Sequence, residues 1–399
     1  MAHVYASNKL YECELGATLM TVIIKSDKKA TVSMGNVNGI KGPQDWSMFF
    51  DFENELYATK QAGLLEQNYK LVDVVEATRP NLIVAPISIS KDGVEKVVAS
   101  TTEIRTALLK NGRFGLLAED LNTNFFLNSS TPATQTIVMP ASGVRIVASC
   151  EGTGSLTITG GFYGSPITVT SDTPKVMERL SAATACTLNI TVSGTLTHAQ
   201  IELATGMQTA TSKVKTGATS ATREREFVKV KKSLFDSIIT NKSALTVLIQ
   251  TIDYNPVVNQ TGFSTCQCLT LVSGSNLKIM RSSGVNGGLQ LFSLSYQYVG
   301  STPSNTLQTV AGPWTSQGRF IARNQACTLD GNTLRSAFNG VDENTLGINN
   351  PFPVDEIGFG YGYNSPIGVN GLRGIVTKLV VYDRVLTQSE ITDITKSWI

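Results

Sequence analysis

The clearest pattern in the chain is the alternation of apolar and polar side chains in Thr187-Leu188-Asn189-Ile190-Thr191-Val192 and in Gly154-Ser155-Leu156-Thr157-Ile158-Thr159-Gly160. Such alternation is typical of β-strands, because successive side chains of a strand point to opposite faces of the sheet. Turn residues separate these segments from further strand-length runs, Val144-Arg145-Ile146-Val147 and Ile167-Thr168-Val169-Thr170. This spacing predicts an antiparallel β-sandwich over residues 131–205.

Composition extends this fold class to the whole chain. Of 399 residues, 41% are hydrophobic and only 16% are charged, whereas an average soluble protein has roughly 25% charged residues. Threonine, serine, asparagine and glycine fill the difference, and these residues suit strands and tight turns. A chain of this length usually divides into more than one hydrophobic core. We therefore expect a mainly β protein made of tandem antiparallel β-sandwiches.

The segments around the central sandwich have less regular patterns. Residues 1–44 contain short alternating runs that end in a glycine- and proline-rich turn, which predicts a small β element and a joint. Residues 45–130 predict a mixed, irregular connecting region, with helix expected only around residues 101–109. Residues 206–225 show no apolar periodicity and predict an extended linker, so we place a domain boundary there.

Strand-length runs return after the linker and continue to the end of the chain. The last of them is Ile375-Val376-Thr377-Lys378-Leu379-Val380-Val381-Tyr382. A helix start follows, because Thr387 and Glu390 form a capping box and Leu386 and Ile391 supply a hydrophobic staple. We therefore expect a short C-terminal helix that packs back on the last sandwich, and we expect that sandwich to fold by itself.

Three motifs occur in serial order. The first, residues 112–129, reads Gly-Arg-Phe-Gly-Leu-Leu-Ala-Glu-Asp-Leu-Asn-Thr-Asn-Phe-Phe-Leu-Asn-Ser and resembles the signature G-L-L-I-E-x-x-x-T-N-L-L-x-x-S. The second comprises residues 152–160 and 194–203, with an Ala-Gln-x-Glu strand and a later Thr222-Arg223. The third, residues 372–391, is similar to the closing strand and helix of concanavalin-A-like, laminin-G-like domains. Together the motifs resemble a modular family of tailed-bacteriophage and prophage virion proteins.

This resemblance implies an architecture and a set of partners. Residues 131–205 would resemble a carbohydrate-binding module, and residues 226–399 would form a concanavalin-A-like lectin domain, a jelly roll with a short terminal helix. Residues 1–44 would attach the chain to other virion proteins, while the downstream domains bind host cell-surface glycan. The chain would form homo-oligomers, and its location would be the virion, assembled in the host cytoplasm.

Three functions are compatible with these domains. The first is a tail fibre or spike adhesin subunit, in which weak sites are multiplied by avidity. The second is a capsid decoration or head-fibre protein, in which the same domains cover or extend from the shell. The third, a glycan depolymerase, fits least well, because the long parallel β-helix repeats common in spike depolymerases are absent from the sequence.

The sequence does not favour catalysis. Hydrolysis needs paired carboxylates, or a nucleophile with a base. The only histidines are His3, in the terminal segment, and His198, on an alternating strand where a structural role is expected. Glu202 belongs to the Ala-Gln-x-Glu strand, and we interpret it as a structural hydrogen-bonding group. We therefore expect no enzymatic activity.

Candidate binding residues lie in the C-terminal third of the chain. A lectin site needs an aromatic face that stacks on a sugar, with amide or carboxylate side chains that pair with hydroxyls. The candidates for glycan binding are Trp314, Tyr361, Tyr363 and Asn364. Oxygen ligands in two acidic loops would suit Ca²⁺, and these are Asp330, Asn332, Asp342 and Glu343. Each of these residues could instead be an ordinary turn or core residue, and no other cofactor is expected.

Charge and cysteine usage argue against other classes of function. The formal net charge is only +2, and the one basic cluster, residues 223–232, is interrupted by two glutamates. We interpret that cluster as a solvated linker and strand edge, and we expect no nucleic-acid partner. The six cysteines form no disulfide framework and are expected to be mostly buried thiols. No apolar run reaches the ~18 residues that span a bilayer, so no membrane insertion is expected.

Overall fold

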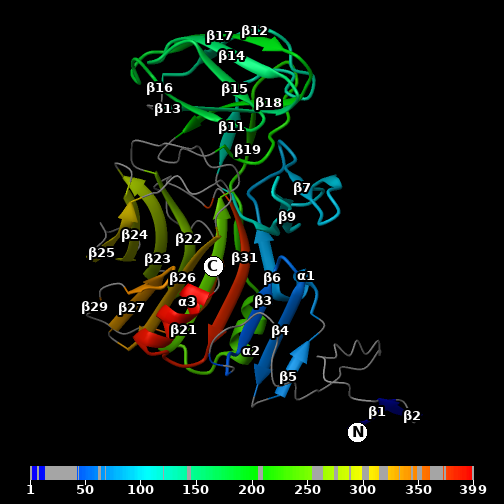
Figure 1. The fold of residues 1–399 in the computed structure, drawn as a ribbon, viewed down its shortest axis with the longest axis vertical. Coiled ribbons are helices and arrows are strands. Elements are labelled where there is room, and N and C mark those ends of the chain that lie inside the picture. Colours follow the sequence, from blue (N-terminus) through cyan, green and yellow to red (C-terminus); the bar gives the residue numbers. More distant parts are fainter. Residues whose placement is uncertain are drawn as a thin grey trace.

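The computed structural model describes residues 2–6, 9–13, 43, 45–61, 64–67, 69–119, 121–141, 145–204, 210–253, 264–273, 277–286, 289–298, 305–313, 322–331, 333–342, 345–347, 353–359, 372 and 374–397. Nearly all regular structure in these residues is antiparallel β-sheet, so the mainly β prediction is confirmed. Figure 1 shows a smaller sandwich at one end of the long axis and a larger pair of sheets below it. We call these the upper and the lower sandwich.

The upper sandwich packs a five-stranded sheet on a four-stranded sheet. The strand order is β16-β13-β18-β11-β19 in the first sheet and β12-β17-β14-β15 in the second. The alternation in the sequence is confirmed, because Leu188 and Ile190 of β17 and Leu156 and Ile158 of β14 all point into the core between the sheets. The strands are β11 (Asn122–Asn124), β12 (Gln135–Met139), β13 (Arg145–Gly152), β14 (Ser155–Gly160), β15 (Ile167–Thr170), β16 (Lys175–Glu178), β17 (Cys186–Ser193), β18 (Leu196–Ala204) and β19 (Ala221–Arg223).

One layer of the lower sandwich is an eleven-stranded sheet. Its main path is β28-β27-β26-β21-β31-β3-β4-β5; β10 also pairs with β31, β9 with β10, and β29 with β27. The strands are β3 (Met48–Asp51), β4 (Leu56–Gln61), β5 (Leu64–Gln67), β9 (Arg105–Leu108), β10 (Phe114–Leu117), β21 (Ala244–Asp253), β26 (Ala322–Asp330), β27 (Thr333–Phe338), β28 (Val341–Asp342), β29 (Leu346–Gly347) and β31 (Gly374–Tyr382).

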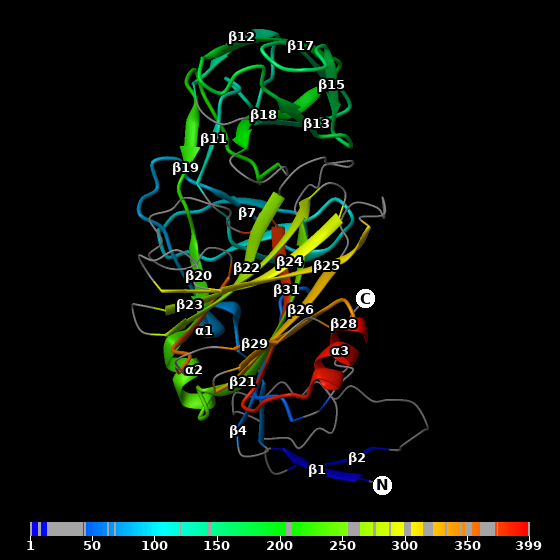
Figure 2. The ribbon, with the colours of Figure 1, turned by 90° about the vertical axis from the view of Figure 1, so that its left-hand side faces the viewer.

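The other layer is a seven-stranded sheet with the order β25-β24-β23-β22-β30-β20-β6. Apolar side chains from both layers form the largest core, in which Phe52 and Phe359 meet edge to face with their ring centroids 5.9 Å apart. Figure 2 shows the two layers and the C-terminal helix beside them. The strands are β6 (Val75–Thr78), β20 (Phe227–Val230), β22 (Ser264–Ser273), β23 (Leu277–Asn286), β24 (Leu289–Tyr298), β25 (Asn305–Pro313) and β30 (Glu356–Phe359).

The strand pairing corrects two predictions for the first third of the chain. Residues 45–130 are not an irregular connector, because β3 pairs with β31 and β6 pairs with β20. The lower sandwich therefore does not begin at residue 226, and residues 226–399 lack strands that its sheets contain. Helix was expected around residues 101–109, but Arg105–Leu108 alternate buried and half-buried side chains and form β9.

The C-terminal helix, α3 (Gln388–Ser397), is capped as the sequence predicts. The backbone N–H of Thr387 donates to Glu390 Oε2 at 2.7 Å, and the backbone N–H of Glu390 donates to Thr387 Oγ1 at 3.2 Å. Leu386, Ile391 and Ile394 are buried against the outer face of the eleven-stranded sheet. This helix therefore closes a second core on the side of the sheet away from the main one.

The remaining elements are short. They are the strand pairs β1 (Ala2–Ala6) with β2 (Lys9–Cys13) and β7 (Ile87–Ile89) with β8 (Glu95–Val97), and the helices α1 (Leu71–Val74) and α2 (Lys232–Ile238). Among the described residues, no helix combines the length and the apolar character needed to cross a bilayer.

Two chain segments connect the sandwiches and run side by side. The chain passes upward between β10 and β11 and returns between β19 and β20, and the backbone N–H of Glu226 on the return donates to the carbonyl oxygen of Glu119 on the way up at 3.0 Å. The predicted extended linker also contributes, because Thr211 and Ser212 are buried at this joint. Residues 210–214 of the predicted linker are therefore part of the packed structure.

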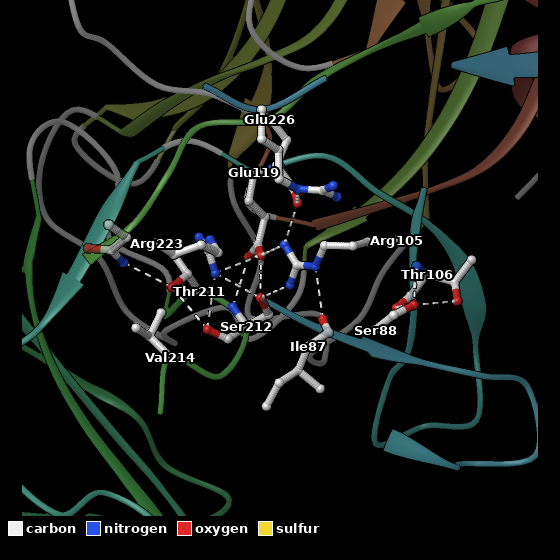
Figure 3. A network of polar contacts seen from close by, with 12 residues as sticks. Ile87, Ser88, Arg105, Thr106, Glu119, Thr211, Ser212, Val214, Arg223 and Glu226 are labelled. Atoms are coloured by element: carbon white, nitrogen blue, oxygen red, sulfur yellow. Dashed lines mark hydrogen bonds and ion pairs between the residues drawn. The ribbon is translucent and has the colours of Figure 1, made fainter. Parts of the chain in front are cut away.

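Buried charges surround these two segments (Figure 3). Arg105 pairs with Glu119 at 3.3 Å and with Glu226 at 3.0 Å, and Arg223 pairs with Glu119 at 2.9 Å. Arg79 pairs with Glu226 at 2.7 Å. Burial alone would raise the pKa of the Glu226 carboxyl, but the charges of Arg105, Arg79 and Arg223 outweigh it and hold that pKa below its usual value. We call these five residues the joint network.

The joint network also corrects the interpretation of the basic cluster. Arg223 was expected in a solvated linker, yet its side chain is buried. Lys232, at the other end of the cluster, forms an exposed ion pair with Asp236 at 2.9 Å. The cluster is therefore divided between the interior and the surface.

Candidate functional site

The candidate site is a groove on the outward face of the seven-stranded sheet. Strand alternation creates this face: Val228 and Val230 of β20 enter the core, while Phe227 and Lys229 point away from it. The groove has a volume of about 500 Å³ and also takes Ile104 from the segment before β9 as part of its wall. It therefore lies where residues from both halves of the chain meet.

A row of residues crosses four neighbouring strands along the groove. Lys229 is opposite Glu76 of β6 on one side and opposite Gly358 of β30 on the other, and Gly358 is opposite Thr270 of β22. Lys229 Nζ lies 3.2 Å from Glu76 Oε1 and 3.0 Å from Glu356 Oε2. Burial would lower the pKa of Lys229, but the two carboxylates outweigh burial and raise it, so the ammonium group stays charged.

Gly358 leaves the floor of the groove open. A Cβ atom placed on this residue would come no closer than 3.8 Å to any neighbour, which is ordinary van der Waals contact. The core packing therefore does not require glycine here. Its effect is to leave a hollow in the row between Lys229 and Thr270.

The groove combines an aromatic ring with charged and hydroxyl groups. Phe227 is half-buried and lies on the same face of β20 as Lys229. Two lysines, Lys229 and Lys231, and two glutamates, Glu76 and Glu356, line the groove, so their formal charges cancel. An aromatic face beside donors and acceptors can stack on the C–H groups of a sugar and pair with its hydroxyls.

The glycan-binding residues predicted from the sequence, Trp314, Tyr361, Tyr363 and Asn364, all lie outside the described residues. The strands that precede them belong to the sheet that carries the groove. Strand β25 ends at Pro313 and β30 ends at Phe359, and the antiparallel order of the sheet makes these two strands run in the same direction. The C-terminal ends of β25 and β30 therefore lie on the same side of the sheet, with three strands between them.

The predicted calcium ligands are not brought together in the part of the chain that the structure describes. Asp330 ends β26 and lies 3.5 Å from Arg335, while Asn332 and Glu343 lie outside the described residues. Asp342 is placed in β28 by its backbone only. Among the described residues, no group of three or more His, Cys, Asp or Glu side chains could hold a metal ion.

Glu202 has the structural role that the sequence predicts. Its side chain is buried, and it accepts hydrogen bonds from the backbone N–H of Thr211 at 3.0 Å and from the side chains of Thr211 and Asn122. The Ala-Gln-x-Glu strand thus holds the segment after residue 209 against the upper sandwich. This carboxylate does not face an open site.

Sequence reasoning missed the residues of the groove. The alternation in Phe227-Val228-Lys229-Val230 marks a strand with one polar face, and this signal was available. The partners of that strand, however, are Glu76 and Gly358, which come from distant parts of the chain. A local pattern gives a strand its two faces but does not identify the neighbouring strands.

No protein-family model and no curated protein sequence matches the chain. A CBM40 of the Ruminococcus gnavus IT-sialidase, bound to alpha2,6 sialyllactose, is similar in structure, with 16% identity, a TM-score of 0.32, and 41% of this chain and 89% of that chain covered. Domain 4 of AbnA, a GH43 extracellular arabinanase from Geobacillus stearothermophilus in complex with arabinotriose, has 14% identity, a TM-score of 0.29, and coverage of 60% of this chain and 87% of that chain. The botulinum neurotoxin serotype D/C VPI 5993 binding domain has 11% identity and a TM-score of 0.30, with 44% of this chain and 42% of that chain covered.

Proposed function

We propose that this chain is a structural protein of a tailed-bacteriophage particle, a tail fibre or spike adhesin subunit that binds glycan on the host cell surface. The observation that supports glycan binding is the groove on the seven-stranded sheet, where Phe227 lies beside Lys229 and its two glutamates. The virion role rests on the resemblance of residues 112–399 to modular phage proteins. The role is binding, without turnover of the glycan.

The balance of charge in the groove suggests the kind of glycan. Because Lys229 and Lys231 match Glu76 and Glu356, the groove presents donors and acceptors with no net charge. Such a lining pairs with the hydroxyls of a neutral sugar and gives no general attraction to a polyanion. Each groove would bind weakly, and a homo-oligomer would gain strength by presenting several grooves to one cell surface.

The N-terminal residues are proposed to attach the chain to the particle. Figure 1 shows the pair β1 and β2 at the opposite end of the long axis from the upper sandwich. An anchor at that end would leave the upper sandwich at the distal end of the molecule.

Gly358→Val tests the groove without removing a contact. The new side chain fills the hollow beside Lys229, and the 3.8 Å clearance and a β-branched residue in a strand both favour retention of the fold. Binding of purified host surface polysaccharide to the full chain should weaken about tenfold or more, which corresponds to about 1.4 kcal/mol. Phe227→Ala should weaken binding in the same way, because it removes the stacking ring.

The matched control is Tyr163→Ala, which removes an exposed aromatic residue from the upper sandwich. This variant should bind like the wild type. Thermal unfolding curves of all variants show whether a variant that loses binding is still folded. Unchanged binding by a folded Gly358→Val would refute the groove as the glycan site, and a decrease in polysaccharide chain length would refute the role without turnover.

The location in the particle has its own test. Particles assembled with a chain that lacks residues 1–44 should contain none of it, whereas a chain with Gly358→Val should be incorporated normally. If the truncated chain is incorporated, the lectin-like part is the docking module, and the capsid decoration or head-fibre function takes the place of the adhesin.

A further inference from the structure

A second cavity lies between the upper sandwich and the β7–β8 strand pair. It has a volume of about 780 Å³, within the range of roughly 300 to 1,000 Å³ of small-molecule sites. One wall is the outward face of the five-stranded sheet, where Glu151 of β13 is opposite His198 of β18. The other wall comes from Ile89 and from the turn after β9, including Leu109 and Lys110. We call this space the joint cavity.

His198 lines this cavity and carries a buried acceptor without a partner. The residue is only 5% exposed, and its Nδ1 atom is buried with no hydrogen-bond partner in the structure. Burial lowers the pKa of His198 below its ordinary value, so the ring is neutral near pH 7. A buried acceptor that lacks a donor costs stability. A ligand that supplied a donor would remove this cost.

Gln200 determines which nitrogen of His198 carries the proton. The backbone N–H of Val214 donates to Gln200 Oε1 at 2.8 Å, and Gln200 Nε2 donates to the carbonyl oxygen of Thr211 at 3.3 Å. These two bonds fix the orientation of the amide. His198 Nε2 lies 3.3 Å from the same Oε1 and therefore donates to it. A neutral imidazole has one N–H, so Nδ1 is left as the acceptor.

Charged groups complete the lining. Lys213 Nζ lies 2.8 Å from Glu151 Oε2 and also pairs with Glu95. Lys110 lies 3.9 Å from Asp172 at the rim. Three carboxylates and two ammonium groups therefore line the cavity, which gives a formal charge of −1 with His198 neutral. This charge disfavours an anion, and the ion pairs with lysine leave no carboxylate of the lining without a cationic partner.

We infer that the joint cavity binds a neutral polyhydroxylated ligand, such as a short segment of an uncharged glycan. A hydroxyl group both donates and accepts, so a ligand in the cavity can donate to Glu151 and accept from Lys213, and a rotation of the His198 ring that uncovers the buried Nδ1 would let the ligand donate there too. The apolar side chains of Ile89 and Leu109 can contact the C–H faces of the same ligand. This site is separate from the groove of the lower sandwich and does not depend on it.

Three variants of the full chain separate the site from the fold. Ser149→Leu places an apolar side chain in the cavity, because Ser149 is paired with Gln200 on the neighbouring strand and points to the same face of the sheet. His198→Phe keeps a ring of similar size but removes the acceptor, and His198→Gln restores an acceptor and a donor on one side chain. All three are made in the Gly358→Val background, which fills the groove of the lower sandwich, and Tyr163→Ala in the same background is the control.

The probes are glucose, galactose and N-acetylglucosamine at millimolar concentration, with sialic acid as the anionic probe, and saturation-transfer NMR detects binding. At least one neutral probe should bind to Gly358→Val and to its Tyr163→Ala control, bind about tenfold or more weakly when Ser149→Leu or His198→Phe is added, and bind to the His198→Gln form nearly as to Gly358→Val itself. If Ser149→Leu does not fold, the two His198 variants carry the test.

Three results in the Gly358→Val background would overturn the inference. They are no binding of any neutral probe, tighter binding of sialic acid than of the neutral probes, and full binding after a folded His198→Phe is added. A neutral probe that binds to the wild type but not to Gly358→Val would place the sugar in the groove, which supports the proposed function and removes the second site. Binding to Gly358→Val that is lost with His198→Phe supports the joint cavity, whether or not the groove binds the same probe.

Discussion

Glu119 and Glu226 lie side by side at the joint, where each carboxylate is held by buried arginines and the two backbones are tied by a hydrogen bond of 3.0 Å. Like charges this close repel one another in a medium of low polarity. Arg105 prevents this repulsion, because its guanidinium pairs with both carboxylates. The position of the upper sandwich therefore depends on a charge balance inside the molecule.

Glu119→Gln should destabilise the protein by about 3–5 kcal/mol, because it leaves buried arginine charge without its partner. The measurement is the free energy of unfolding in urea. Asp172→Asn is the control: it removes one partner of an exposed ion pair with Lys110 and should change the free energy by about 0–1 kcal/mol. Equal effects of the two substitutions would show that the joint network does not stabilise the fold.

A fragment of residues 226–399 should fail to fold cooperatively. In the full chain, the edge of β31 is covered by β3 and β10, and β20 is covered by β6. All three covering strands lie before residue 226 and would be missing. A chain of residues 45–399 keeps them and should unfold in one or two sharp transitions. A soluble fragment of residues 226–399 with a cooperative calorimetric transition would contradict this prediction.

Thr387→Ala should cost about 1 kcal/mol of stability, because the side chain of Thr387 accepts the backbone N–H of Glu390 at the start of α3. Ser389→Ala, at an exposed position of the first turn, should change stability by less than about 0.5 kcal/mol. Urea unfolding of both variants provides the comparison. A loss confined to Ser389→Ala would mean that the capping box does not hold the helix.

Acid should weaken the wild type more than His198→Gln. The folded-state pKa of His198 lies below its ordinary value of about 6.5, because burial opposes charging. The unfolded chain therefore binds the proton more readily, and the stability present above about pH 6.5 is lost as the pH falls toward the lowered folded-state pKa. Urea unfolding at pH 7.5 and pH 5.5 should show this extra loss in the wild type only. Parallel losses in both proteins would refute it.

Local patterns predicted the parts of the fold that depend on neighbours in sequence. The alternation at Leu188 and Ile190 predicted the upper sandwich, and the spacing of Thr387 and Glu390 predicted the capped helix. The pairing of β3 with β31 could not be found in this way, because the two strands come from opposite ends of the chain. Which strands pair depends on the packing of the whole core, and a local sequence pattern carries no information about that pairing.

The same limit applies to the charged residues. Arg223 has the sequence context of an exposed linker residue, and only the proximity of Glu119 explains its burial. Lys229 and Glu76 form a site only because β20 and β6 pair in register. Glu202 could be interpreted correctly because it belongs to a recognisable strand motif, and its partner Thr211 is only nine residues away in sequence. The role of a side chain was thus easier to predict when its partner lay close to it in sequence.

The adjacent connections at Glu119 and Glu226 have an evolutionary consequence. Residues 121–223 leave the lower sandwich and rejoin it at neighbouring points, so they form an insertion whose two ends nearly meet. An insertion of this geometry can be exchanged for another domain without disturbing the sheets below it. A replacement would need to supply groups equivalent to Arg223 and Ser212, which pair with Glu119 from above. The joint can therefore act as a cassette boundary, at which recombination changes the distal module while the base stays constant.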